Sequence, residues 1–260
     1  MKEDVIPNSS NKFLFILGPA VAMTMAMLTS AVIPWGREIE LFGRTIPLQI
    51  ADINIGILYV FGVVSMGVYG IMIGGWASNN KFSLMSSLRA ASQAISYELA
   101  MGLALIALLM TTESLSLKTI VEQQVQGNWW NIVYQPLGFL LFFIAALAEC
   151  NRTPFDLPEA ENELNFGYHQ EYSSMKLGFY LFAEYINMIM SSAIMASMYF
   201  GGYDLPFFDE STVAPNIAAM IGVGTLLIKI VLFIFLFMWI RWTIPRFRYD
   251  QLMNLGWKTM

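Results

Sequence analysis

Residues 214–240 read APNIAAMIGVGTLLIKIVLFIFLFMWI, and Lys229 is the one charged residue among them. A helix that crosses the hydrocarbon core of a bilayer needs about 20 mostly apolar residues, and this stretch is longer than that. It therefore predicts a transmembrane helix.

The rest of the chain has the same character. Of its 260 residues, 57% are hydrophobic and 13% are charged, and the mean hydropathy is +0.56. Soluble domains carry roughly 25% charged residues, so we expect a single polytopic, all-α membrane domain over residues 1–260. The fourth apolar window is short, but Trp129, Trp130 and Tyr134 around its start suit an anchor among the lipid headgroups. About six transmembrane helices are predicted, in the windows 13–34, 53–76, 93–112, 132–148, 175–201 and 214–240.

The basic residues indicate how these helices are oriented. Six spans put both termini on one side of the membrane, and the segments on that side hold ten Lys and Arg residues against three on the other. Because cytoplasmic segments carry the excess of Lys and Arg, we expect both termini to be cytoplasmic. The ten are Lys2, Lys12, Lys81, Arg89, Arg152, Lys176, Arg241, Arg246, Arg248 and Lys258, and the three are Arg37, Arg44 and Lys118.

The composition also excludes several classes of function. A net charge of −5 argues against nucleic-acid binding, which needs a basic face. Cys150 and His169 are the single cysteine and the single histidine, too few for an iron–sulfur site, a haem with two histidine ligands or a paired-histidine metal site. We therefore expect that this chain binds no metal and no redox cofactor of its own.

Three charged side chains fall inside the apolar windows and away from the window ends: Glu98, Glu184 and Lys229. Each costs at least about 2.5 to 3.5 kcal/mol in a membrane unless it is paired, hydrated or neutralised, so each is a candidate functional residue. With a rise of about 1.5 Å per residue, both glutamates lie roughly 12 to 14 Å from the cytoplasmic ends of their helices, and Lys229 lies near the middle of the membrane. The structural alternative is that Glu98 reaches the headgroups, or that Glu184 and Lys229 share a hydrogen bond.

Glu184 also belongs to a polar stripe. The spacing i, i+4, i+7 and i+11 places four polar side chains on one helical face, which should meet protein or water and not lipid. They are Tyr180, Glu184, Asn187 and Ser191.

An acidic loop lies between the fourth and fifth windows. Between residues 149 and 174 it holds six carboxylates, and Arg152 is its one Lys or Arg residue before Lys176. An acidic cluster is most often a solvated face, but this one is interleaved with aromatic and apolar residues, so part of it should be buried. Asp156, Pro158 and Glu159 indicate a helix start, and burial with mutual repulsion should raise some pKa values of the loop carboxylates towards neutrality. The six are Glu149, Asp156, Glu159, Glu161, Glu163 and Glu171.

The same loop carries a recognisable sequence. Residues 148–164 read AECNRTPFDLPEAENEL, followed by GYHQEYS at 167–173, MK at 175–176 and AEY at 183–185. This stretch resembles the H-subunit family of NADH:quinone oxidoreductase, the respiratory complex I. The match has no gaps, which makes it a specific one.

The resemblance extends over essentially the whole chain. Outside the loop it includes GWASNNK at 75–81, SYE at 96–98, RFRYDQ at 246–251 and GWK at 256–258. Family members usually begin with another transmembrane helix and a basic surface segment, and end with one more helix. We therefore expect this chain to be an internal portion of a longer family architecture.

The resemblance implies a multi-pass protein in a bacterial inner membrane, at the junction between the membrane arm and the hydrophilic arm of the complex. There it would help form the quinone site and couple quinone reduction to proton translocation, without turnover on its own. The implied partners are the iron–sulfur and quinone-site hydrophilic subunits, the adjacent membrane subunits, quinone and membrane lipid, and nucleic acid is not among them.

The candidate site residues follow from this match. Arg152 is the expected local counter-charge of the acidic residues, and Lys229 is a candidate intramembrane partner. The expected proton or coupling residues are Glu98, Glu149, Asp156, Glu159, Glu161, Glu163 and Glu184.

Two other functions stay open at this point. The first is the homologous membrane component of a membrane-bound hydrogenase, which needs no quinone. The second is a stand-alone proton or cation transporter, which intramembrane carboxylates would suit. The sequence shows no paired repeats, and that argues against the transporter.

Overall fold

The computed structural model describes residues 3–8, 10–41, 43–127, 129–158, 161–205 and 214–260. It is mainly helical, and β1 and β2 form a small antiparallel hairpin in which Ile39 pairs with Ile46. In chain order the elements are α1 (Lys12–Leu28), η1 (Thr29–Val32), β1 (Ile39–Leu41), β2 (Arg44–Ile46), α2 (Gly56–Ala77), α3 (Lys81–Thr112), α4 (Leu117–Gln126), α5 (Asn131–Tyr134), α6 (Pro136–Glu149), α7 (Glu161–Leu164), η2 (Gly167–His169), α8 (Ser174–Tyr199), α9 (Pro215–Thr243), α10 (Tyr249–Asn254) and the π-helical turn η4 (Leu255–Thr259).

Five helical segments in the described part of the chain are long and apolar enough to cross a membrane. They are α1 continued by η1, α2, α3, α8 and α9, and they correspond to five of the six predicted spans. The chain is therefore a multi-pass membrane protein. The prediction of an all-α integral membrane protein is confirmed, with the β hairpin as a small addition.

The fourth predicted window is divided into two helices. α5 has 4 residues and α6 has 14, and between them Gln135 leaves the helical region with φ −134° and ψ 64°. Pro136 accounts for this break, because proline disfavours a helical conformation in the residue before it and is itself suited to begin a helix. At about 1.5 Å per residue α6 is roughly 21 Å long, which is shorter than a hydrocarbon core of about 30 Å.

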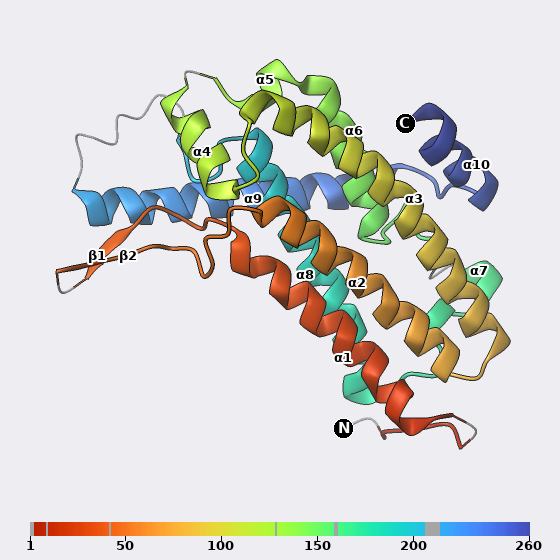
Figure 1. Ribbon diagram of the computed structural model, residues 1–260. Helices are drawn as coiled ribbons and strands as arrows, with labels where there is room; N and C mark the ends of the chain where they lie inside the picture. The colour runs from red at the N-terminus through yellow and green to blue at the C-terminus, as the bar shows by residue number, and fades with distance from the viewer. Residues whose placement is uncertain (1–2, 9, 42, 128, 159–160, 206–213) are drawn as a thin grey trace.

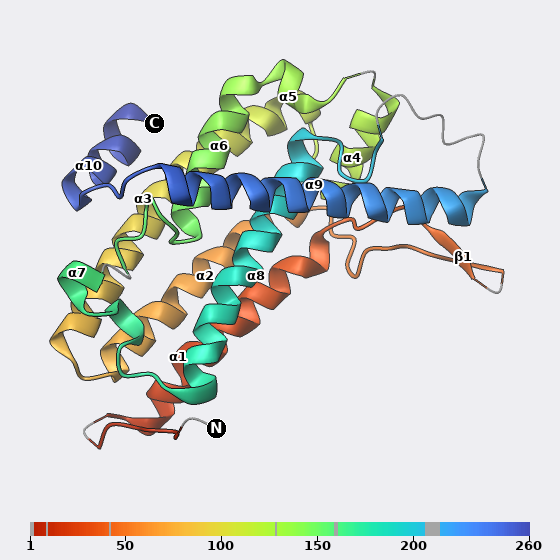
Figure 2. The ribbon, with the colours of Figure 1, turned by 180° about the vertical axis from the view of Figure 1, so that it is seen from behind.

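Most of the long helices run side by side. Figures 1 and 2 show that the axes of α1, α2, α3 and α8 are roughly aligned, while α9 lies obliquely across α8. α1 packs between α2 and α8, and α3 packs between α2 and α6. The carboxyl-terminal α10 and η4 return to the middle of α3, where the Tyr97 hydroxyl donates to the Leu252 carbonyl over 3.0 Å.

Glycine allows α1 and α2 to approach closely. A Cβ atom on Gly70 would lie 2.8 Å from the backbone nitrogen of Ala22, and one on Gly18 would lie 2.9 Å from the Cα of Gly74. Such contacts between backbones are possible only with small residues at the helix interface.

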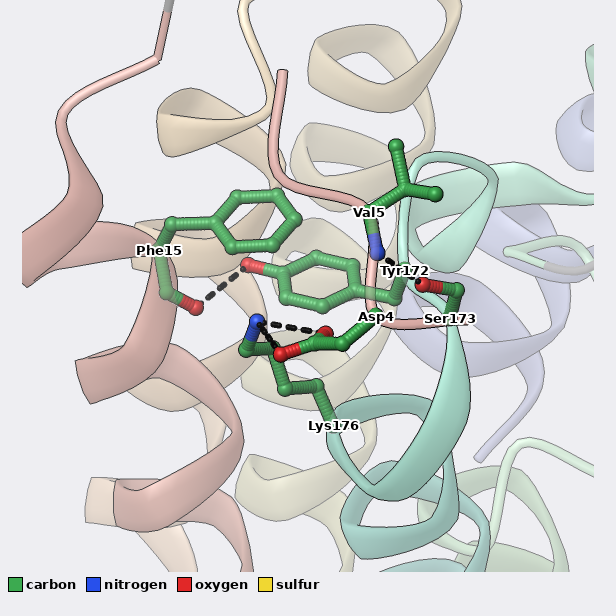
Figure 3. A network of polar contacts seen from close by, with 6 residues as sticks. All are labelled: Asp4, Val5, Phe15, Tyr172, Ser173 and Lys176. Atoms are coloured by element: carbon green, nitrogen blue, oxygen red, sulfur yellow. Dashed lines mark hydrogen bonds and ion pairs between the residues drawn. The ribbon is translucent and has the colours of Figure 1, made fainter. Parts of the chain in front are cut away.

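The amino-terminal segment is fastened to the start of α8 (Figure 3). Both carboxylate oxygens of Asp4 accept from Lys176 Nζ, at 2.7 and 2.9 Å, and the backbone N–H of Val5 donates to the Ser173 hydroxyl over 3.0 Å. Beside them the ring of Tyr172 stacks on Phe15 with centroids 4.1 Å apart. Burial raises the pKa of Tyr172 to about 12, so its hydroxyl stays protonated and donates to the Phe15 carbonyl.

Candidate functional site

Glu184 lies at the centre of the polar groups predicted from the sequence. It is buried on α8, with 7% of its surface exposed, and Arg152 is similarly buried with 8% exposed. Arg152 Nη2 lies 3.1 Å from Glu184 Oε2, and the guanidinium carbon lies 4.8 Å from the centre of the Tyr185 ring. The Tyr168 hydroxyl donates to Glu184 Oε1 over 2.7 Å. The expected counter-charge Arg152 is therefore placed against one particular carboxylate.

Gln93 positions the turn that carries Arg152. This side chain of α3 is completely buried, and its amide nitrogen lies 2.7 Å from the Ala148 carbonyl and 2.8 Å from the Phe155 carbonyl. The turn between those carbonyls leaves α6 at Glu149 and then presents Arg152 to Glu184. Gln93 was not among the predicted site residues, although an uncharged amide at the start of an apolar window was a visible signal.

Two further loop carboxylates pair with basic residues from distant parts of the chain. Asp156 Oδ2 lies 2.9 Å from Arg246 Nη2, beyond the end of α9, and Glu163 Oε2 lies 2.7 Å from Arg89 Nη1 of α3. Asp156 is buried, but the Glu163 side chain is 62% exposed, so solvent screens its pair. Basic residues outside the loop therefore balance part of its negative charge.

Two predicted loop residues cannot be placed in this cluster. Glu159 lies outside the described residues, and only the backbone of Glu161 is described, in the first turn of α7. The predicted helix start at Asp156 to Glu159 falls partly on the same undescribed segment.

Glu149 and Glu184 line a common cavity of about 50 Å³. Tyr180 and Asn187 of the α8 stripe also line it, and Ser191 lines a neighbouring cavity of about 20 Å³ to which Glu149 also belongs. The stripe thus faces the protein interior, as its spacing predicted. The cavity of about 50 Å³ can hold water beside its polar side chains, because one water needs only about 10 to 15 Å³ of such volume.

Glu98 lies at the edge of this region. It is half-buried on α3 and accepts a hydrogen bond from the Ser65 hydroxyl of α2. This contact lies within the helix bundle, so the alternative in which Glu98 only reaches the headgroups is not supported.

Lys229 lies apart from the predicted site carboxylates, contrary to its interpretation as their partner. Its ammonium group donates to the carbonyls of Phe200, Gly202 and Asp204, over 2.7, 2.8 and 2.6 Å, and lies 4.7 Å from the centre of the Trp130 ring. These groups follow the last turn of α8, at the opposite end from the acidic loop. The alternative in which Glu184 and Lys229 share a hydrogen bond is therefore not supported.

A larger cavity lies outside this site. A cavity of about 590 Å³ lies between the β hairpin, α4 and the start of α9, on the side of the molecule away from Glu184. Within the described part of the chain, no group of three or more His, Cys, Asp or Glu side chains is arranged to hold a metal ion.

Comparison with known proteins gives a consistent family. The sequence model of the NADH dehydrogenase family matches residues 1–260. The first H subunit of the NADH-quinone oxidoreductase of Cytophaga hutchinsonii is 66% identical over 260 residues, which cover 100% of this chain and 76% of that protein. The H subunit of Flavobacterium johnsoniae is 62% identical over 261 residues (100% and 74%), and that of Thermomicrobium roseum is 47% identical over 268 residues (100% and 75%).

The similarity to these relatives extends over the full length of the chain. The chain therefore belongs to the NADH dehydrogenase family, as an H subunit of the NADH-quinone oxidoreductase type.

Proposed function

We propose that this chain helps to form the quinone site of an NADH:quinone oxidoreductase and couples quinone reduction to proton translocation through its carboxylate cluster. The chain is a membrane subunit of this class of complex and is not catalytic alone. The observation that carries the coupling role is the buried Glu184, held by Arg152 and Tyr168 beside a cavity that Glu149 also lines.

The arrangement suits controlled proton transfer. A carboxylate buried in a membrane protein is stable as an ion only when partners replace its hydration, and Arg152 and Tyr168 supply such partners. The cavity between Glu149 and Glu184 has room for water, which can pass a proton from one carboxylate to the other. Loop residue Asp156 forms an ion pair with Arg246, and Glu163 forms one with Arg89. A change of charge on a quinone bound nearby would alter the electrostatic energy of these pairs.

The surroundings of the chain are part of the proposal. Electrons reach quinone from an iron–sulfur cluster of a hydrophilic partner subunit, and adjacent membrane subunits continue proton transfer. The acidic loop and both termini face the cytoplasm of a bacterium, an orientation supported by ten Lys and Arg residues on that side against three on the other. The named relatives are all NADH-quinone oxidoreductases, which favours this function over a component of a hydrogenase or a separate transporter.

Replacement of Glu184 by Gln in the complete complex tests the coupling role. Glutamine keeps the size of the side chain but cannot take up a proton. We expect NADH oxidation by an artificial electron acceptor to be unchanged, which reports assembly, and NADH-driven proton uptake into membrane vesicles to be lost. Asn187→Leu is the matched control, because Asn187 lines the same cavity but cannot titrate, and it should keep proton uptake.

A double variant separates proton transfer from the effect of removing one charge of a buried ion pair. Glu184→Gln removes the carboxylate that lies 3.1 Å from the buried Arg152, and the loss of one partner of a buried pair by itself destabilises a protein. Glu184→Gln combined with Arg152→Gln removes both charges and should still lack proton uptake. Normal uptake in either variant would contradict the proposal.

A further inference from the structure

Tyr168 is a buried residue of the acidic loop that contacts Glu184. It has 1% of its surface exposed, and its hydroxyl donates to Glu184 Oε1 over 2.7 Å. Arg152 occupies the other oxygen, Oε2, at 3.1 Å. The two oxygens of this carboxylate thus face chemically different partners.

The backbone around Tyr168 fixes the position of its ring. Asn165, Phe166 and Gly167 have φ values of 49°, 76° and 75°, a left-handed run that reverses the chain just before Tyr168. A Cβ atom on Gly167 would lie 2.1 Å from the Pro158 carbonyl oxygen, so the close approach requires glycine. The Tyr168 carbonyl then accepts a hydrogen bond of 2.7 Å from the Ser83 hydroxyl of α3.

Neighbouring rings complete this support. Tyr168 meets Tyr180 edge to face with centroids 5.2 Å apart, and Tyr180 meets Tyr172 in the same manner at 5.0 Å. Tyr172 in turn stacks on Phe15, at the site shown in Figure 3. The Tyr180 hydroxyl donates to the Gly70 carbonyl over 3.1 Å and the Tyr172 hydroxyl to the Phe15 carbonyl, so both have backbone acceptors while Tyr168 has a carboxylate.

The chemistry of the two partners decides which oxygen can be protonated. Arginine has only N–H donors and no acceptor, so an oxygen that faces it cannot carry a proton without losing that contact. A tyrosine hydroxyl can either donate or accept, and its hydrogen can rotate. Oε1 can therefore gain a proton and donate it in a hydrogen bond to Tyr168 Oη, while Arg152 stays on Oε2.

We propose that Tyr168 is a positioning residue for proton transfer at Glu184, and that it selects Oε1 as the oxygen that is protonated. This inference rests on the proposed coupling role of Glu184. The incoming proton leaves a group or water in the cavity shared with Glu149, and an O–H bond forms at Oε1. The bond between the donor and this proton is the one bond that breaks, while the Tyr168 hydroxyl changes from donor to acceptor and turns its own hydrogen towards the cavity, which Tyr168 also lines.

Infrared difference spectroscopy of the complete complex tests the hydrogen bond directly. The Glu184 carboxyl band in the NADH-reduced minus oxidised spectrum is identified by its disappearance in Glu184→Gln. We expect Tyr168→Phe to shift the frequency of this band, because the carboxyl group loses its hydroxyl partner. Tyr172→Phe is the matched control, since it removes a similarly buried hydroxyl that bonds to backbone carbonyls and does not line the cavity, and it should leave the band in place.

Proton uptake supplies the functional measurement. Tyr168→Phe should lower NADH-driven proton uptake about tenfold, the factor expected for losing a hydrogen bond to a charged group, with unchanged NADH oxidation by an artificial acceptor. Tyr172→Phe should keep uptake near the unaltered level. The inference is overturned by an unshifted Glu184 band, by an equal shift in Tyr172→Phe, or by normal uptake in Tyr168→Phe.

These outcomes differ from a failure of the proposed function. If Glu184→Gln pumps protons normally, the coupling role of Glu184 is wrong whatever Tyr168 does. If Glu184→Gln abolishes uptake and Tyr168→Phe leaves both band and uptake unchanged, the coupling role stands and the positioning role of Tyr168 is wrong.

Discussion

The contacts of Glu184 explain how a buried carboxylate can be stabilised inside a membrane protein. The attraction between two buried charges is largely offset by their lost hydration, so further hydrogen bonds are needed to keep the pair. Arg152 and Tyr168 together meet that requirement on separate oxygens. The neutral partner leaves one oxygen able to change its protonation state while the ion pair persists.

Gln93 supports the site without touching a carboxylate, and this gives a prediction. Gln93→Leu removes two buried hydrogen bonds, to the carbonyls of Ala148 and Phe155, which then keep only their backbone donors. One hydrogen bond contributes about 0.5 to 1.5 kcal/mol, so the loss of two should lower the thermal stability of the complex and the yield of assembled complex. Thermal inactivation of the purified complex measures this.

Gln123→Leu on α4 is the control for Gln93→Leu. Gln123 is exposed and donates to one carbonyl, that of Thr112, over 3.1 Å. Water can replace this donor, so the stability should stay close to that of the unaltered complex. Equal losses in the two variants would show that burial of Gln93 has no special importance.

The charged residues of the site could be predicted from the sequence, and their neutral supports could not. Glu98 and Glu184 stand out because a charge is rare in an apolar window. Gln93 and Tyr168 are ordinary residue types, and their importance depends on contacts with elements distant along the chain. Lys229 was placed with the wrong partners, because helical rise gives a depth but not the neighbours that a tilted helix meets.

Among the helices, α2 provides a prediction based on two glycines. A Cβ atom on Gly74 would lie 1.9 Å from Tyr180 Oη and 3.1 Å from Tyr172 Oη, whereas a Cβ atom on Gly62 would meet nothing within 4 Å. Gly74→Ala should therefore displace the tyrosines and destabilise the complex by about 1 to 3 kcal/mol, as overpacking commonly does. Gly62→Ala should change the stability by less than about 0.5 kcal/mol. Thermal inactivation of both variants tests this, and similar midpoints would contradict the packing of Tyr180 against α2.

Hydropathy predicted the long helices but not all of their limits. The third window begins at residue 93, whereas α3 begins at Lys81. Its first turns contain serines, which lower the hydropathy, yet Ser83 and Ser86 are buried because their hydroxyls bond to the carbonyls of Tyr168 and Pro158. Contacts with the acidic loop therefore replace lipid as the surroundings of this part of α3.

The whole molecule has two ends with different chemistry. At one end the acidic loop, the amino-terminal segment and the start of α3 gather around the carboxylates. At the other, the β hairpin and α4 lie near the end of α8, where Lys229 binds three backbone carbonyls. A cation suits this position, because the carbonyl end of a helix carries partial negative charge. The two ends are thus suited to opposite sides of the membrane.

Cysteine labelling tests which end faces the cytoplasm. Lys81→Cys and Gln126→Cys place thiols at exposed positions at opposite ends of the molecule, in a Cys150→Ser background. The native Cys150 is buried, and burial raises the pKa of its thiol to about 12, so the unaltered protein should stay unlabelled near neutral pH. Because Lys and Arg gather on the side of Lys81, a membrane-impermeant maleimide should label Lys81→Cys in inside-out vesicles and Gln126→Cys in intact spheroplasts. Labelling of both positions from the same side would contradict the passage of α3 through the membrane. The reverse pattern would place the carboxylate cluster outside the cytoplasm, where a cytoplasmic NADH-oxidising arm could not reach it.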